Sequence, residues 1–186
     1  FVIRWNCCKI IDHRHFRHSS LSKMRLSTTL LICAIFGACS GDSAPVFTDA
    51  SAAIDQADSA MSAGDNDLAK AGYEYARDNG EGALEADALV GLFELGCAGS
   101  DDDMAYANFE SLSKSHAAKL TQGELKRMVD LCVKSATVET GDSIIDYAMQ
   151  AFPEMQDDLT NPAAAIEKIR TEGPGADLSG LGYAGD

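Results

Sequence analysis

The chain has 186 residues, 46% of them hydrophobic, which suits one globular domain with little room for a second. Residues 1–38 carry six Lys and Arg against one Asp, a net charge of about +5, whereas residues 39–186 carry nine Lys and Arg against 28 Asp and Glu, about −19. Phosphate would be repelled by so acidic a domain, so we exclude nucleic acid as a partner and expect basic partners.

Residues 1–23 hold three histidines together with Cys7 and Cys8, and these are residue types that bind zinc. The two cysteines are adjacent, however, and the histidines lack the i, i+4 spacing that puts two ligands on one helix face. The segment opens with Phe1 and precedes the first methionine, Met24. We therefore expect residues 1–23 to be a non-native or disordered upstream extension rather than a metal site.

Residues 24–38 have the layout of a secretory signal peptide. Arg25 supplies a positive charge, residues 26–36 form a short apolar run, and the small residues Gly37 and Ala38 stand before Cys39. The apolar run is too short to cross a bilayer, which takes about 20 apolar residues. We expect the signal peptide to be removed.

The sequence Phe36-Gly37-Ala38-Cys39 resembles the lipobox of bacterial lipoproteins, although that family usually has Leu where this chain has Phe36. The resemblance implies cleavage before Cys39, acylation of its thiol and new amine with fatty acids such as palmitate, and lasting attachment to the cell membrane. Ser40, where an Asp would favour the inner membrane, implies the outer membrane, facing the periplasm. The alternatives are an ordinary secreted protein and an uncleaved anchor.

Residues 39–48 are polar and predict a tether, after which the pattern is helical with no sustained strand alternation. Residues with capping character begin the helical runs: Asp65-Asn66, Ser100 with Asp103, Thr121 with Glu124, and Asn161 before Pro162. The pattern predicts one helical domain over 49–171, with helices over 49–63, 67–79, 82–97, 102–115, 122–136, 142–152 and 162–171. Residues 172–186 are rich in glycine and predict a disordered tail.

The helices fall into pairs, and two of the pairs share a spacing of small and aromatic residues. In the first pair these residues are Gly64, Ala69, Tyr73 and Ala76, and in the second they are Gly99, Ala105 and Phe109. This spacing resembles the second half of a tetratricopeptide repeat, and a third copy at Gly141 is poor. The resemblance implies an all-α, tetratricopeptide-like helical hairpin stack that binds a peptide or helix of another protein. An irregular helical bundle is the alternative fold.

If the chain is cut before Cys39, that cysteine carries lipid and Cys97 and Cys132 remain as an even pair. In an oxidising compartment such a pair predicts a disulfide. In a repeat stack, both cysteines would lie near the same end of neighbouring helices. Two buried thiols are the alternative, which is favoured by the position of Cys132 on an apolar helix stripe.

The sequence offers little for catalysis, and we expect no enzyme activity, no cofactor and no metal. His116 is the only histidine after residue 18 and forms no recognisable triad. Asp101, Asp102 and Asp103 lack the spacing of a calcium loop and are explained as acids in a first helical turn. The predicted function is a lipid-anchored protein-binding module of the cell envelope, whose partner is an envelope protein or peptide. The alternative is a structural subunit of an envelope assembly.

Overall fold

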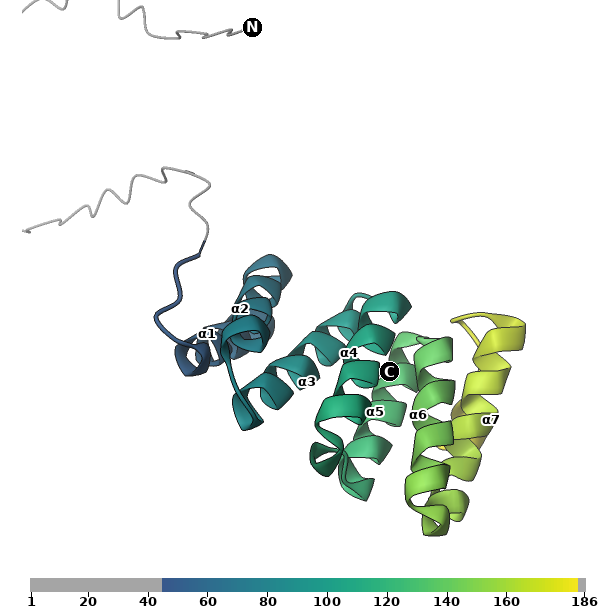
Figure 1. Ribbon diagram of the computed structural model, residues 1–186. Coiled ribbons are helices and arrows are strands. Elements are labelled where there is room, and N and C mark those ends of the chain that lie inside the picture. The colour runs from purple at the N-terminus through teal and green to yellow at the C-terminus, as the bar shows by residue number, and fades with distance from the viewer. Residues whose placement is uncertain (1–44, 184–186) are drawn as a thin grey trace, which may run out of the picture. The chain divides into compact units, whose positions relative to one another are not determined.

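The computed structural model describes residues 45–183, so the predicted signal peptide, the predicted lipobox with Cys39 and most of the predicted tether lie outside the described residues. Over residues 45–183 the chain forms seven α-helices and no strand (Figure 1). Their bounds are α1 (Ala50–Ala63), α2 (Asn66–Asn79), α3 (Ala83–Ala98), α4 (Asp102–Ser115), α5 (Gln122–Ser135), α6 (Val138–Ala151) and α7 (Gln156–Glu172). Three 3-10 turns, η1 (Ala117–Lys119), η2 (Pro153–Met155) and η3 (Ser179–Leu181), complete the described chain.

Consecutive helices pack against one another as hairpins, α1 with α2, α3 with α4, and α5 with α6, and α7 packs on α6 (Figure 1). Contacts also link α1 to α3, α3 to α5 and α5 to α7, so the odd-numbered helices form one layer of the stack. Helices α4 and α6 contact each other in the other layer. The predicted fold class, an all-α stack of helical hairpins, is confirmed.

Small residues let the helices within a hairpin approach closely. A Cβ atom at Gly72 on α2 would lie 2.8 Å from the carbonyl oxygen of Ala53 on α1, and one at Gly96 on α3 would lie 2.7 Å from the amide nitrogen of Ala105 on α4. Neither position can hold a larger residue without a shift of the backbone. The first two hairpins therefore owe their tight packing to glycine facing alanine.

Tyr73 joins the first hairpin to the second. Its ring lies on Gly91 of α3, where a Cβ atom would overlap it, and its hydroxyl donates to Asp58 Oδ1 at 2.6 Å. Burial, followed by the bond to Asp58, raises the pKa of this hydroxyl above its ordinary value. Ala69 and Ala76 are fully buried beside it on α2. The small-aromatic-small spacing thus supplies an inter-helix packing contact.

The main core lies between α3 and α7, and it is filled by large side chains from all five helices. Its fully buried members include Phe93, Leu112, Met128, Ile144 and Ile166. Phe109, at the edge of this core, meets Tyr147 edge-on with ring centroids 5.8 Å apart. Burial of this core is the chief stabilising contribution to the second half of the stack.

Helix α6 begins at Val138, four residues before the predicted start, because its cap comes from another helix. Asp102 on α4 accepts from the amides of Glu139 and Thr140, each at 3.0 Å, and from the Thr140 hydroxyl. Thr137, the residue before the helix, makes no side-chain cap bond. The cap of α4 also differs from the prediction. Asp101, and not Ser100, caps this helix by accepting from the amide of Met104 at 3.0 Å.

Helix α7 begins at Gln156, so the prediction that Asn161 and Pro162 start it is wrong. Pro162 lies inside the helix and has no amide to donate to the carbonyl of Asp158. Met155 and Leu159 are nearly fully buried in the core, and this burial holds the preceding turn against the stack in helical form.

The glycine-rich tail also differs from the expectation of disorder over residues 173–183. Leu178, Leu181 and Tyr183 pack on the core, and the Tyr183 hydroxyl donates to Asp130 Oδ1 on α5 at 2.7 Å. Lys168 of α7 donates to the carbonyl of Asp177 at 2.5 Å. Three apolar side chains and two hydrogen bonds offset the ordering entropy that the glycines increase.

Candidate functional site

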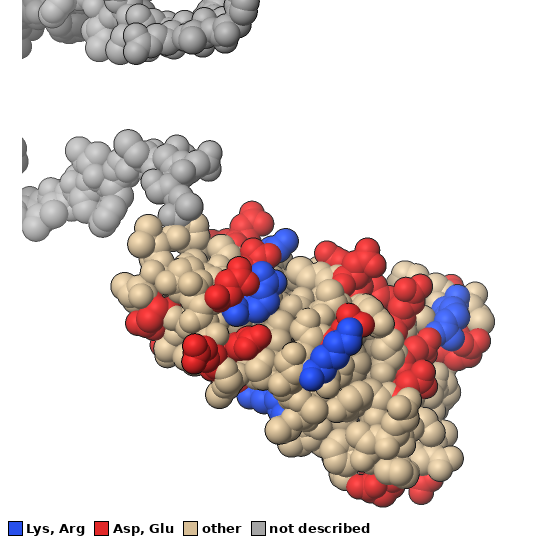
Figure 2. Space-filling view, in the orientation of Figure 1, with Lys and Arg blue, Asp and Glu red and all other residues tan. Residues whose placement is uncertain are grey.

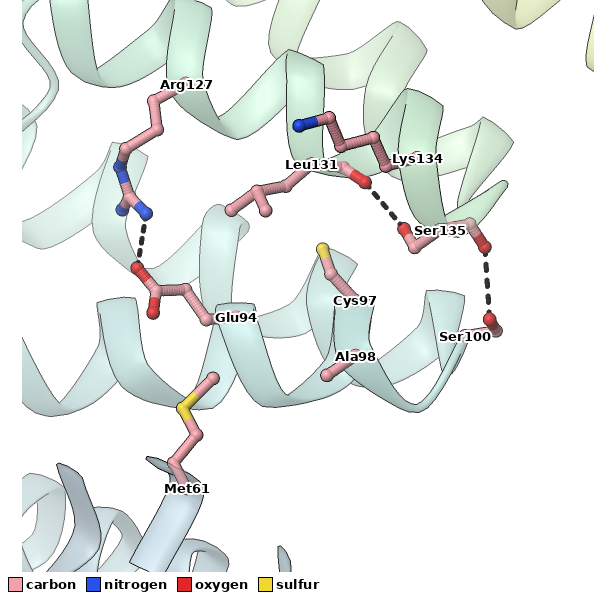
Figure 3. A pocket seen from close by; sticks show the side chains of 9 residues that line it. All are labelled: Met61, Glu94, Cys97, Ala98, Ser100, Arg127, Leu131, Lys134 and Ser135. Carbon is pink, nitrogen blue, oxygen red and sulfur yellow. Dashed lines mark hydrogen bonds and ion pairs between the residues drawn. The ribbon is translucent and has the colours of Figure 1, made fainter. Parts of the chain in front are cut away.

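A pocket of about 400 Å³ opens on the odd-numbered layer of the stack, between α1, α3 and α5 (Figure 3). Its walls come from three successive helices of one layer, so no single hairpin could form it. The lining residues are Met61 from α1, Glu94, Cys97 and Ala98 from α3, Ser100 from the following turn, and Arg127, Leu131, Lys134 and Ser135 from α5.

The centre of the pocket is apolar. Leu131 points from α5 toward α3, and Met61 reaches toward the same space from α1 (Figure 3). Both side chains are only partly buried, and Ala98 beside them is exposed. An apolar side chain of a partner would therefore find an unbranched, adaptable thioether and a leucine to contact.

Charged groups stand at one end of this apolar centre. Arg127 donates to Glu124 at 2.6 Å on its own helix and to Glu94 across the pocket (Figure 3). These bonds, with Glu124 the larger cause, raise the pKa of the guanidinium. Lys134 lies away from Arg127, beside Ser135 (Figure 3), and takes part in none of the ion pairs formed within residues 45–183.

Hydroxyl groups form the opposite end. Ser100 donates to the carbonyl of Ser135 at 3.1 Å, which ties the α3–α4 turn to the end of α5 (Figure 3). The Ser135 hydroxyl donates in turn to the Leu131 carbonyl at 2.9 Å. Ser100 and Ala136 both have positive φ values, 52° and 58°, which turns the chain sharply on each side of this contact.

Cys97 forms part of the pocket wall, and Cys132 lies behind it in the core. Both are free thiols in this structure, and both adjoin Thr137: Cys97 Sγ lies 3.9 Å from its hydroxyl, and its amide donates to the Cys132 carbonyl at 3.0 Å. Interaction with Cys132, and more weakly with Thr137 and Ser135, lowers the pKa of the Cys97 thiol. The same interaction and burial raise the pKa of Cys132. The disulfide predicted from the sequence stays a prediction.

The same face of α5 continues toward α7, where the tail covers it. A second hollow of about 360 Å³ there is lined by side chains of α5, α7 and the tail, including Lys126, Asp130, Lys134, Asp158 and Tyr183. Lys134 lines both hollows. The odd-numbered layer thus has two parts. The part over α1, α3 and α5 is open, and the part over α5 and α7 is covered by residues 173–183.

Of the residues singled out in the sequence, Cys97 and the predicted capping residue Ser100 line the open pocket. Gly64 and Gly99 end α1 and α3, and the remaining repeat positions Ala69, Tyr73, Ala76, Ala105 and Phe109 are buried between helices. The pocket residues Arg127, Leu131 and Lys134 were missed. Their i, i+4, i+7 spacing is a second stripe on α5, beside the buried stripe of Leu125, Met128, Val129 and Cys132.

The other candidate groups from the sequence lie elsewhere. His116 follows α4, and its Nε2 is 3.3 Å from Glu85 Oε2, without the geometry of a hydrogen bond. Of the three consecutive aspartates, Asp101 caps α4 and Asp102 caps α6. Within residues 45–183 no group of three or more His, Cys, Asp and Glu side chains is placed to hold a metal ion.

Comparisons with models of known families, with curated proteins and with solved structures find no match to this chain. Within residues 45–183, no helix combines the length and apolar character required to cross a membrane. Function must therefore be inferred from the surface of the stack itself.

Proposed function

We propose that the helical stack is a protein-binding module, attached to the cell envelope through lipid on Cys39, which captures a segment of a basic envelope protein in the pocket between α1, α3 and α5. The observation that carries this proposal is the composition of that pocket. It has an apolar centre at Met61 and Leu131, bordered by fixed charges and by hydroxyl groups. An apolar centre with a polar rim is the usual anatomy of a protein-binding surface.

The preference for a basic partner rests on the surface charge. The described residues include 26 Asp and Glu against nine Lys and Arg, a net charge of about −17. Figure 2 shows acidic side chains spread over the visible face, with the basic ones scattered between them. Such a field favours encounter with a positively charged segment and weakens as salt rises.

Site-specific photocrosslinking in the native host tests this proposal. A photoreactive phenylalanine analogue replaces Leu131 in the pocket of the full-length chain, and a matched variant carries it at Met149, an exposed residue on α6 in the other layer. We expect one discrete envelope protein to be crosslinked from position 131 and not from position 149, with a yield that falls as salt is raised.

Peptide mapping of the adduct supplies the decisive outcome. The crosslinked segment of the partner should contain an apolar side chain flanked by Lys or Arg. Equal crosslinking from positions 131 and 149, or a partner segment without basic residues, would contradict the proposed mode of binding.

The lipid anchor needs a separate test, because Cys39 lies outside the described residues. Intact mass is measured on protein extracted with detergent from host membranes, beside a Cys39→Ala variant. We expect a chain beginning at Cys39 with two or three acyl groups, which the variant lacks. A chain that is cleaved but not acylated would mean secretion, and one that starts at Phe1 would overturn the export argument.

A structural role within a larger assembly is the alternative that the sequence left open, and a large exposed apolar patch would favour it. Within the described residues, the large hydrophobic side chains that are exposed are those of Val46, Tyr106 and Met149. Val46 precedes α1, Tyr106 lies on α4 and Met149 lies on α6, so no observation favours this alternative over binding.

A further inference from the structure

The two cysteines of the described chain are arranged unequally around one contact. Cys97 Sγ lies 3.9 Å from Thr137 Oγ1, and the Thr137 amide donates to the Cys132 carbonyl at 3.0 Å, so the two residues meet at Thr137 between α3 and α5. Cys97 lies in the wall of the open pocket, whereas Cys132 is fully buried behind it. In Figure 3 the Cys97 sulfur points from α3 toward α5. A reagent entering the pocket therefore meets Cys97 first.

The surroundings of Cys97 favour its thiolate. The hydroxyl of Thr137 lies 3.9 Å from its sulfur. Interaction with Cys132, and more weakly with Thr137 and Ser135, lowers the pKa of Cys97, whereas the pKa of Cys132 is raised. The nucleophile of the pair is thus the cysteine that lines the pocket.

We propose that Cys97 is a site of thiol–disulfide exchange with small disulfides that enter the pocket, and that Cys132 resolves the product into a Cys97–Cys132 disulfide. This inference does not rest on the proposed partner. It extends the disulfide predicted from the sequence, because it assigns Cys97 as the attacking residue, Cys132 as the resolving residue and the pocket as the path by which the small disulfide enters.

The exchange needs no oxidant other than the small disulfide. The Cys97 thiolate attacks one sulfur of that disulfide, whose S–S bond breaks and releases one small thiol, which takes up the proton lost by Cys97. Cys132 then attacks the Cys97 sulfur, and the second small thiol leaves with the proton of Cys132. Two thiols of the chain are oxidised, and one small disulfide is reduced to two thiols.

The test uses the reduced full chain and bis(2-hydroxyethyl) disulfide, a small neutral probe, in buffer that keeps the protein folded. Remaining thiols are blocked with N-ethylmaleimide, and the unreduced protein is digested with trypsin. Cys97 falls in the peptide 78–114 and Cys132 in the peptide 128–134, so each is separated from the four N-terminal cysteines. We expect these two peptides to be linked to each other.

Two matched variants assign the roles. In Cys132→Ser, the peptide 78–114 should carry one 2-hydroxyethylthio group, because the mixed disulfide has no resolving thiol. In Cys97→Ser, the peptide 128–134 should stay free of that group. An adduct on Cys132 in place of Cys97 would overturn the assignment. The wild-type chain decides the proposal even if a variant fails to fold: unlinked peptides, or a link from 78–114 to an N-terminal cysteine, would refute it.

Discussion

Asp102 joins two hairpins through a single carboxylate. It accepts from the first amides of α6 and from the hydroxyl of Thr140, which is fully buried. We expect Asp102→Ala to lower the free energy of unfolding by about 2 kcal/mol, because amides at a helix start lose their acceptor. Chemical denaturation measures the change. Asp103→Ala removes the same charge from the next, exposed position and should have an effect below about 0.5 kcal/mol; equal losses would contradict the capping role.

The Tyr73 ring packs directly on Gly91, and the ring has little freedom to move because its hydroxyl is hydrogen-bonded to Asp58. We expect Gly91→Ala to destabilise the stack by about 1–3 kcal/mol through overpacking, despite the better helix propensity of alanine. Gly123→Ala on α5 is the matched control, since a Cβ there meets nothing within 4 Å. Thermal unfolding should show a loss only for Gly91→Ala, and a gain in both variants would rule out the steric argument.

At the residue scale the sequence predicts what is local. Asp65 and Thr121 were identified as helix starts, and both accept the expected amide three residues on. Asp102 could not be identified as the cap of α6, because nothing in the sequence near Val138 points to a residue on α4. The sequence predicts Ser100 with Asp103 as the start of α4, whereas Asp101 is the cap, and Ser100 has a positive φ of 52° that turns the chain before it.

One of the two hydrogen bonds that attach the tail involves a titratable donor, the Tyr183 hydroxyl. Burial, and then the bond to Asp130, raises the pKa of Tyr183 above 10. The bond requires the neutral hydroxyl, and Tyr183 ionises at a lower pH when the tail is detached than when it is docked. The stability that the bond contributes is therefore complete below pH 10 and is lost as pH rises further. We expect the protection factors of the amides in residues 176–183, which correct for base-catalysed exchange, to fall above pH 10. Tyr183→Phe should give faster exchange at pH 7 and remove this alkaline step; an unchanged step would exclude Tyr183 as its source.

A disulfide between Cys97 and Cys132 would tie α3 to α5. We expect the oxidised chain to be more stable than the reduced chain by about 2–4 kcal/mol, because the bond closes a long loop of the unfolded state. Denaturant unfolding of the two forms, with Cys97→Ser under both conditions as control, measures this difference. A lower midpoint for the oxidised form would mean that the bond strains the contact between the helices.

At the element scale, α6 and α7 show where sequence patterns stop being informative. Five helices begin and end within one residue of the predicted bounds, since their caps and apolar stripes are contiguous in the chain. The start of α7 was placed at Pro162 because a proline normally opens a helix, whereas the burial of Met155 and Leu159 extends it backwards. Tertiary burial overrides the local signal in both the helix and the tail.

The whole stack could be predicted as an all-α fold, but its pocket could not. The hairpins follow from periodicity, because each helix has an apolar stripe and short connections. The pocket joins Met61, Glu94 and Leu131, which lie on three helices and share no motif. Only the register between hairpins brings them together, and that register is determined by contacts such as Tyr73 on Gly91.

The net charge of the described residues, about −17, acts on the whole stack at once. Carboxylates repel one another in the folded state more than in the expanded chain, and added salt screens this repulsion. We expect Tm to rise by about 2–4 °C between low and physiological ionic strength. NaCl and KCl at equal ionic strength should act alike, because screening does not depend on the cation. The same salt should weaken capture of a basic segment, so stability and crosslinking yield from position 131 must change in opposite directions; a parallel change would exclude acidic surface charge as the basis of partner choice.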